Sequence, residues 1–189
     1  MSETTSTKSN KPLLSTKEMI LSALFAAIIT VCAWISIPIG AVPITFHTFA
    51  VFCALNLLGG KNGTLSFIVY LLLGIVGLPV FAGFKSGIAV VLGPTGGYLW
   101  GYLLMCLLYW VGTKLLGKKL PVRIVLMTLG LMICYLFGTI WFVLVYSDNG
   151  ISFYSALKVC VIPFVPFDLI KLALSIIITD RIKKYTAIQ

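Results

Sequence analysis

Two charged residues lie inside an otherwise apolar stretch near the carboxyl end of the chain. Asp168 and Lys171 belong to residues 163–171, which read Pro-Phe-Val-Pro-Phe-Asp-Leu-Ile-Lys. In a helix that begins near Pro166, they would lie at positions i and i+3 on one face. Lys171 would then be about 18 Å of helix rise from the basic cluster that follows Asp180, well inside a membrane. A charge at that depth costs at least ~2.5–3.5 kcal/mol on insertion scales, so it normally has a partner or a function.

This charged pair has two interpretations. Asp168 and Lys171 could simply neutralise each other within one helix. They could instead bind a ligand that carries both hydrogen-bond donors and acceptors. We expect Asp168 to lie in the first turn of its helix, where the helix dipole favours a negative charge. The residues alone leave both interpretations open.

Other residues could complete a pocket around the pair. Lys85 could hold a ligand carboxylate, or it could be an ordinary solvated lysine. His47 could hydrogen-bond a ligand, or it could be a satisfied polar group at the start of a helix. The aromatic residues that could line a pocket, or equally belong to an interfacial belt, are Trp34, Phe46, Phe81, Phe84 and Tyr98.

The composition indicates a membrane environment. The chain has 189 residues, of which 60% are hydrophobic and 10% are charged. Aqueous globular domains carry roughly 25% charged residues, so we predict an integral membrane protein with one compact membrane domain. The net charge of +9 could suggest nucleic-acid binding. However, the charges lie at the ends of apolar runs, so anionic inner-leaflet lipid explains the excess better and no nucleic-acid partner is expected.

The apolar runs predict an all-α, polytopic fold with six transmembrane helices. We expect a disordered cytoplasmic tail at residues 1–15, the six-helix membrane domain at 16–184 and a cytoplasmic C-terminal end at 185–189. The expected spans are residues 16–37, 42–58, 64–77, 98–116, 122–146 and 166–180, with turns at 59–63 and 147–150 and a short amphipathic piece at 151–162. Residues 78–97 are rich in Gly and Pro yet apolar, and such backbone is tolerated at membrane depth only inside protein or along a cavity. We therefore expect a re-entrant or capping outer loop over a pocket.

Basic residues are unevenly divided between the two sides of this topology. With the amino terminus inside, eleven Lys and Arg residues fall on the inner side: Lys8, Lys11, Lys17, Lys61, Lys114, Lys118, Lys119, Arg123, Arg181, Lys183 and Lys184. Two, Lys85 and Lys158, fall on the outer side. This bias predicts a multi-pass protein of the cell membrane with both termini cytoplasmic. The Gly/Pro-rich loop and the Asp168 end of the last helix would then meet on the outer side.

No sequence motif supports catalysis. The chain contains no G-x-x-x-x-G-K-[ST], H-E-x-x-H or G-x-S-x-G sequence and no paired carboxylates. We therefore expect neither an enzyme nor an ATP-hydrolysing subunit. Five cysteines are scattered through apolar runs without a C-x-x-C pair, and His47 has no cysteine close by in the sequence. No metal site and no cofactor are expected, and buried cysteines of this kind act as small hydrophobes.

Four segments, taken in order, carry a family resemblance. They read Val-Pro-Ile-Thr-Phe-His-Thr-Phe-Ala-Val at 42–51, Gly-Ile-Val-Gly-Leu-Pro-Val-Phe-Ala-Gly at 74–83, Leu-Gly-Pro-Thr-Gly-Gly-Tyr at 92–98 and Pro-Phe-Asp-Leu-Ile-Lys at 166–171. Together they resemble the BioY family, the biotin-specific S components of energy-coupling-factor (ECF) vitamin transporters. The resemblance covers nearly the whole chain from the first helix to the last. The sequence departs from the family at His47, where Gln is usual, and near Phe84 and Lys85, where Gly or Ser is usual.

The resemblance implies a six-helix membrane protein that captures biotin from outside with high affinity. It implies as partners a transmembrane coupling protein and two ATP-binding-cassette ATPases, which supply the energy. Ala23 and Ala27 lie four residues apart in the first span, and small residues at this spacing let another helix approach closely in lipid. In the family this surface would dock on the coupling protein. Transport would involve toppling of the whole S component in the membrane.

Biotin suits the expected site because it combines a neutral ureido ring, an apolar thioether ring and a valerate carboxylate. We expect Asp168 to accept from a ureido N–H and Lys171 to donate to the ureido carbonyl. The carboxylate would lie near Lys85 or the backbone N–H groups of Gly96 and Gly97, although the opposite ligand orientation stays open. Further biotin contacts are expected at Phe46, His47, Thr95 and Tyr98.

Other functions remain open at this point. The same fold serves several vitamins, so the chain could be an S component for a different one. It could also be a self-sufficient small-solute carrier or channel, which would need a second gate on the inner side, where the sequence suggests no Gly/Pro break. A membrane enzyme is the least supported alternative.

Overall fold

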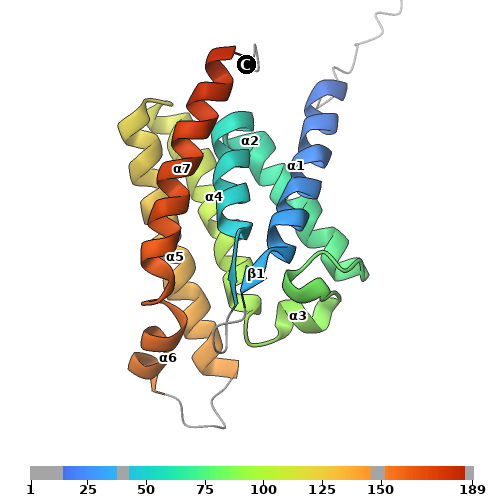
Figure 1. Ribbon diagram of the computed structural model, residues 1–189, viewed down its shortest axis with the longest axis vertical. Helices are drawn as coiled ribbons and strands as arrows, with labels where there is room; N and C mark the ends of the chain where they lie inside the picture. The colour runs from blue at the N-terminus through green and yellow to red at the C-terminus, as the bar shows by residue number, and fades with distance from the viewer. Residues whose placement is uncertain (1–14, 38–42, 146–151, 186–189) are drawn as a thin grey trace, which may run out of the picture.

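The structure, a computed structural model, describes residues 15–37, 43–145 and 152–185. The predicted tail before Ser15, the predicted turn at 147–150 and the C-terminal residues after Tyr185 lie outside these ranges. The described chain is a bundle of helices joined by one small two-stranded ribbon (Figure 1). The all-α prediction is therefore correct except for that ribbon.

The first helix, α1 (Thr16–Trp34), begins where the sequence indicates a helix start. The Ser15 hydroxyl accepts a hydrogen bond from the Glu18 N–H at 3.2 Å, and the Glu18 carboxylate accepts one from the Ser15 N–H at 2.8 Å. This reciprocal capping box satisfies two N–H groups at the helix end. The helix ends before Ile37, the predicted end, because β1 (Ser36–Ile37) pairs antiparallel with β2 (Ile44–Thr45).

The second helix, α2 (His47–Val76), combines two of the predicted spans. Its only non-helical residue is Gly59, with φ of 80° and ψ of 173°. The left-handed φ favours glycine, and the chain bends sharply there (Figure 1). The turn predicted at 59–63 is thus confined to one residue, and Gly60 to Gly63 continue as helix.

The Gly/Pro-rich segment forms no continuous helix, as predicted. It contains the short 3-10 helix η1 (Ala82–Phe84) and the short helix α3 (Ile88–Leu92). Two tryptophans from the long helices hold its ends: the Trp34 indole N–H donates to the Pro79 carbonyl at 2.8 Å, and that of Trp141 donates to the Gly93 carbonyl at 3.0 Å. These bonds fix the segment against the bundle.

The remaining helices are α4 (Gly96–Leu116), α5 (Leu120–Val145), α6 (Phe153–Cys160) and α7 (Phe164–Tyr185). Helices α4 and α5 pack against each other, and α7 packs against α2. Because α7 begins at Phe164, Asp168 lies beyond its first turn. The prediction that Asp168 lies in the first turn of its helix is therefore wrong. The first turn tolerates Pro166 because an N–H at that position has no helical acceptor to lose.

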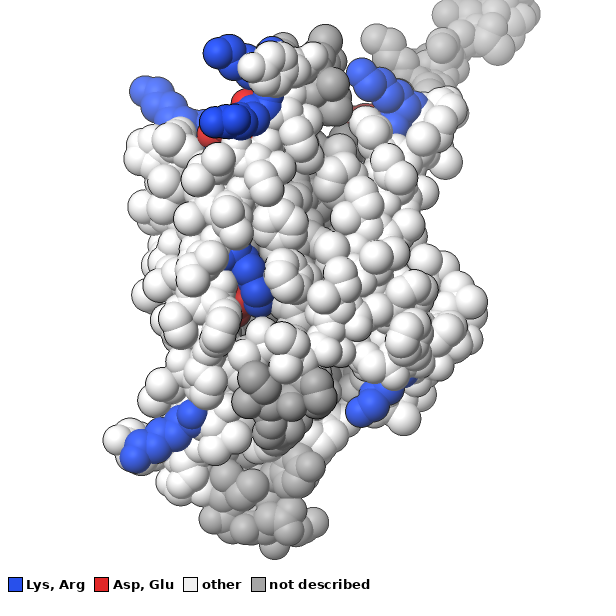
Figure 2. Space-filling model, in the orientation of Figure 1, with Lys and Arg blue, Asp and Glu red and all other residues white. Residues whose placement is uncertain are grey.

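Four of the described helices, α1, α2, α4 and α5, are long and apolar enough to cross a membrane. A fifth span results if α6 and α7, bent by 46° at their junction, count as one. The chain is therefore a multi-pass membrane protein. The first residues of α1 and the last of α7 lie at the same end of the bundle (Figure 1). Figure 2 shows Lys and Arg side chains gathered mainly at that end, which we call the basic end.

Close packing between α4 and α5 depends on a glycine that sequence reasoning placed in the ligand site. A Cβ atom on Gly97 would collide with the Trp141 side chain. We expect Gly97→Val to lower the stability of the purified protein by about 1–3 kcal/mol, the usual cost of overpacking. Thermal unfolding in detergent measures this change, with Ala89→Val at an exposed position as the control. If the Gly97→Val protein unfolds like wild type but loses ligand affinity, Gly97 belongs to the ligand site after all.

Candidate functional site

One pocket of about 160 Å³ lies between the two-stranded ribbon, the Gly/Pro-rich segment and the surrounding helices. It is enclosed by β2, the Gly/Pro-rich segment and helices α1, α2, α4, α5, α6 and α7. Its lining residues are Ala33, Pro43, Thr45, His47, Thr48, Tyr70, Phe81, Ala82, Lys85, Val90, Thr95, Tyr98, Leu99, Tyr102, Tyr135, Cys160, Phe164, Asp168 and Lys171. The pocket thus gathers residues from across the whole sequence.

The Asp168–Lys171 pair forms the polar wall of the pocket. Lys171 Nζ donates to Asp168 Oδ1 at 2.8 Å and to the Thr45 carbonyl of β2 at 2.7 Å. The Tyr135 hydroxyl of α5 donates to Asp168 Oδ2 at 2.6 Å. Both charged residues are buried, with exposed fractions of 2% for Asp168 and 6% for Lys171. Figure 2 shows basic and acidic atoms together in a recess at mid-height of the molecule, away from both ends.

This network leaves hydrogen-bonding capacity for a ligand. A lysine ammonium has three N–H donors, and Lys171 uses two of them. An ionised carboxylate has about four lone-pair sites, and the bonds from Lys171 and Tyr135 occupy two at Asp168. One donor and about two acceptor sites therefore stay available beside each other. Asp168 and Lys171 do neutralise each other, but each keeps hydrogen-bonding capacity that the pairing does not use.

Aromatic side chains form much of the remaining wall. The His47 ring lies 4.7 Å from that of Tyr102 and 5.1 Å from that of Tyr70, measured between centroids. His47 is buried, and its Nε2 atom has no hydrogen-bond partner among the described residues. The interpretation of His47 as a fully satisfied polar group is therefore wrong for this atom. Next to it, the hydroxyls of Thr48 and Tyr102 are hydrogen-bonded at 2.6 Å.

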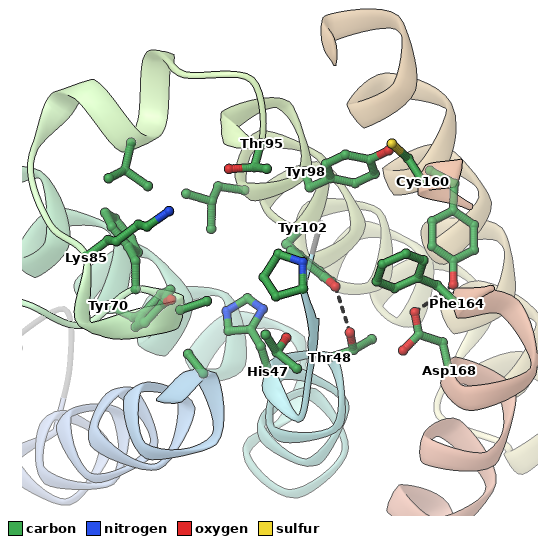
Figure 3. A pocket seen from close by; sticks show the side chains of 18 of the residues that line it. His47, Thr48, Tyr70, Lys85, Thr95, Tyr98, Tyr102, Cys160, Phe164 and Asp168 are labelled. Atoms are coloured by element: carbon green, nitrogen blue, oxygen red, sulfur yellow. Dashed lines mark hydrogen bonds between the residues drawn. The ribbon is translucent and has the colours of Figure 1, made fainter. Parts of the chain in front are cut away.

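A second cation lies across the pocket from the pair. Lys85 and Thr95 come from the Gly/Pro-rich segment and its junction with α4, whereas Asp168 lies on the far wall (Figure 3). Lys85 is exposed, in contrast to Lys171. The pocket therefore has a buried polar end, an aromatic middle and an exposed basic end, and it can hold a molecule that is polar at both ends and apolar between them.

The structure separates the predicted site residues into two groups. Six line the pocket: His47, Lys85, Thr95, Tyr98, Asp168 and Lys171. Phe46 does not line it and is 46% exposed. Gly96 and Gly97 do not line it either, and neither has a positive φ. A Cβ atom would meet the Val91 carbonyl at Gly96 and Trp141 at Gly97, so these glycines serve backbone packing.

Several lining residues were not predicted, among them Tyr135, Thr48, Tyr70, Tyr102 and Phe164. A threonine hydroxyl inside an apolar helix is a weak sequence signal, because it can bond to its own helix backbone. Tyr135 bonds to a residue 33 positions away, which no local pattern reveals. Among the described residues, no group of three His, Cys, Asp or Glu side chains could hold a metal ion.

The predicted docking residues lie away from the pocket. Ala23 and Ala27 are exposed on α1, whereas the buried face of this helix carries Phe25, Ala26 and Ile29. The face they share is free to meet lipid or another protein.

The fold and the pocket define a polytopic helical membrane protein with a buried, charged ligand pocket near one end. Residues 4–187 match the pattern of the BioY family, and the chain belongs to that family. It is 45% identical to the biotin transporter BioY of Thermotoga maritima over 89% of this chain and 96% of that protein. It is 39% identical to the probable biotin transporter BioY of Pyrococcus horikoshii over 92% of this chain and 100% of that protein.

A solved structure agrees with these relatives. The crystal structure of the S-component for biotin from an ECF-type ABC transporter superposes with a TM-score of 0.79. The two chains are 31% identical, and the match covers 89% of this chain and 91% of that one. At this identity and coverage, the likeness extends to the whole fold.

Proposed function

We propose that this protein is the biotin-capturing S component of an ECF-type, ATP-driven importer. The observation that carries the proposal is the buried Asp168–Lys171 pair, which keeps one free N–H donor beside free carboxylate lone pairs. A ureido group presents the complementary set, one carbonyl acceptor and two N–H donors. The relatives named as biotin transporters and the S-component structure support the same ligand.

Biotin would lie with its ureido ring at the buried end. Asp168 accepts from a ureido N–H, and Lys171 donates to the ureido carbonyl. The apolar thioether ring then contacts the aromatic walls, including Tyr102 and Phe164. The valerate chain points toward Lys85 and the Thr95 hydroxyl, which line the pocket, whereas Gly96 and Gly97 do not. Exclusion of water from such a pocket strengthens each of the buried polar contacts.

The proposed membrane orientation places the basic end in the cytoplasm and the pocket on the outer side. The positive-inside rule supports this orientation, because most of the described Lys and Arg residues lie at the basic end. The exceptions are Lys85, Lys158 and the buried Lys171. Counting the halves of α2 on either side of Gly59 separately gives six crossings. The Gly/Pro-rich segment would act as a cap over bound biotin, held by its two tryptophan hydrogen bonds.

Partner proteins would provide the energy for import. No nucleotide-binding P-loop occurs in the sequence, so the chain itself is proposed to be a non-enzyme that depends on two ATPases and a transmembrane coupling protein. The exposed Ala23 and Ala27 face of α1 is the proposed docking surface for the coupling protein. Small residues there allow close helix approach in lipid.

Purification of the full chain tests the proposal directly. Mass spectrometry should find biotin bound to the protein as isolated, and calorimetry should measure its rebinding after removal. Thiamine and riboflavin serve as competitors of different shape. Binding of another vitamin in place of biotin would make the chain an S component of different specificity. Biotin uptake into vesicles that contain this chain alone would support a self-sufficient carrier instead.

A variant of Lys85 tests the orientation of the ligand. Because Lys85 is exposed, its pairing with a carboxylate contributes only about 0.2–1 kcal/mol. We expect Lys85→Gln to weaken biotin binding by up to about fivefold and to leave binding of biotin methyl ester unchanged. Lys158→Gln is the matched control, since Lys158 is also exposed and does not line the pocket. Equal losses for biotin and its ester would place the carboxylate elsewhere.

A further inference from the structure

A second cavity lies at the basic end of the bundle, where the bend of α2, the α4–α5 junction and the last turns of α7 meet. It encloses about 350 Å³. It is lined by Asn56, Leu57, Leu58, Gly59, Gly60, Tyr109, Thr113, Lys118, Arg123 and Lys183. It shares none of these residues with the pocket proposed for biotin. Three of the lining residues are cations and none is an acid.

The centre of this cavity wall is a buried arginine. Arg123 is 8% exposed, and its Nε donates to Asn56 Oδ1 at 2.9 Å. One of its terminal nitrogens donates to Asp180 Oδ1 at 2.8 Å. The Tyr109 hydroxyl also donates to Asn56 Oδ1, at 3.4 Å. These bonds fix the guanidinium in one orientation, which lowers the entropy lost when it binds a ligand.

The cavity keeps unmatched positive charge. A guanidinium has five N–H donors, and Arg123 uses two of them in the bonds described. Asp180 balances one of the three positive charges. Lys118 and Lys183 form no ion pair within the described part of the chain. A net excess of two cations around a polar recess, at the end of a membrane protein, favours an anion with several acceptor oxygens.

We infer that this cavity binds a phosphate group, either the headgroup of an anionic lipid or a soluble phosphate. Arginine presents a planar fork of donors that matches phosphate oxygens, and the two lysines add charge at the rim. Basic pockets between transmembrane helices on the cytoplasmic side are typical headgroup sites. Gly59 carries no side chain and has open space where one would lie, so a phosphate can approach the backbone at the bend of α2. The site is independent of biotin and of the pocket at the other end.

Native mass spectrometry of the full chain in detergent tests the lipid source. We expect the protein to retain phosphatidylglycerol in preference to phosphatidylcholine. Replacing Lys118 or Lys183 with Gln should each reduce phosphatidylglycerol retention about fivefold, since a basic residue near a charged lipid surface contributes about that factor. Arg123 is left intact because it also holds Asp180 and Asn56 in place. Lys184→Gln is the matched control, because it removes an exposed lysine of the same helix turn that does not line the cavity.

Thermal unfolding with inorganic phosphate tests the soluble source. Phosphate at constant ionic strength should raise the unfolding temperature of the wild-type protein but not of the Lys118→Gln/Lys183→Gln double variant. Lipid retention without a phosphate effect identifies a headgroup site, and a phosphate effect alone identifies a soluble ligand. The inference is overturned if neither probe binds. It is also overturned if Lys184→Gln reduces retention as much as the cavity variants, since diffuse surface charge then explains the binding.

Discussion

Asp168→Asn should reduce biotin affinity by roughly 10- to 150-fold, the effect of losing a charge-assisted hydrogen bond. The substitution keeps the shape of the side chain but removes the negative charge that faces Lys171 and the Tyr135 hydroxyl. Lys171 is then a buried cation that has a neutral amide as its neighbour, so the ligand-free protein should also unfold at a lower temperature. Calorimetry with purified protein and biotin measures the affinity.

A double variant separates ligand binding from simple charge neutralisation. Lys171→Met should weaken binding to a similar degree as Asp168→Asn, because it removes the donor expected to face the ureido carbonyl. The combined variant has no unpaired charge, so it should recover stability but still fail to bind biotin. Wild-type affinity in the combined variant would mean that the pair serves the fold alone. Asp180→Asn is the control, since it also removes a paired aspartate of α7 but lies at the basic end.

The sequence reveals this pair because a charge inside an apolar run is conspicuous in a membrane protein. It does not reveal the partners. Lys171 donates to the Thr45 carbonyl, which is 126 residues away and belongs to a ribbon of two-residue strands. Such short strands have no periodicity to detect. A backbone carbonyl also carries no residue-type signal, so this contact depends on tertiary structure alone.

Glycines are difficult to interpret for a different reason, because a glycine can be required by a left-handed φ, by close helix packing or by a ligand. At Gly59 the need is a left-handed φ, and the sequence correctly indicates a break in that region. At Gly97 the need is room for Trp141 of a neighbouring helix, which the sequence cannot distinguish from room for a ligand. Lys85 and Thr95 do line the pocket, although the residue type alone left Lys85 open between a ligand contact and an ordinary solvated lysine.

Ala23→Trp and Ala27→Trp should abolish assembly with a coupling protein while leaving biotin affinity unchanged. Both alanines are exposed on α1, whereas the residue of this helix that lines the pocket proposed for biotin is Ala33. Helices in lipid attract one another mainly through close van der Waals contact, and an indole ring would hold the partner helix away. Co-purification with the coupling protein and ATP-dependent biotin uptake should therefore both be lost.

Two control variants test whether any loss of assembly is specific to the exposed face of α1. Val125→Trp places the same ring on the exposed face of α5, and it should assemble and transport normally if docking is specific to α1. Ala26→Trp places the ring in the buried face of α1, where Ala26 is 1% exposed, so it should lower the unfolding temperature and disturb biotin binding. Normal uptake by both the Ala23 and Ala27 variants would exclude this face as the docking surface. Loss of biotin binding in those variants would show that the exposed face of α1 supports the fold instead, because a ring that meets only lipid or a partner leaves the pocket intact.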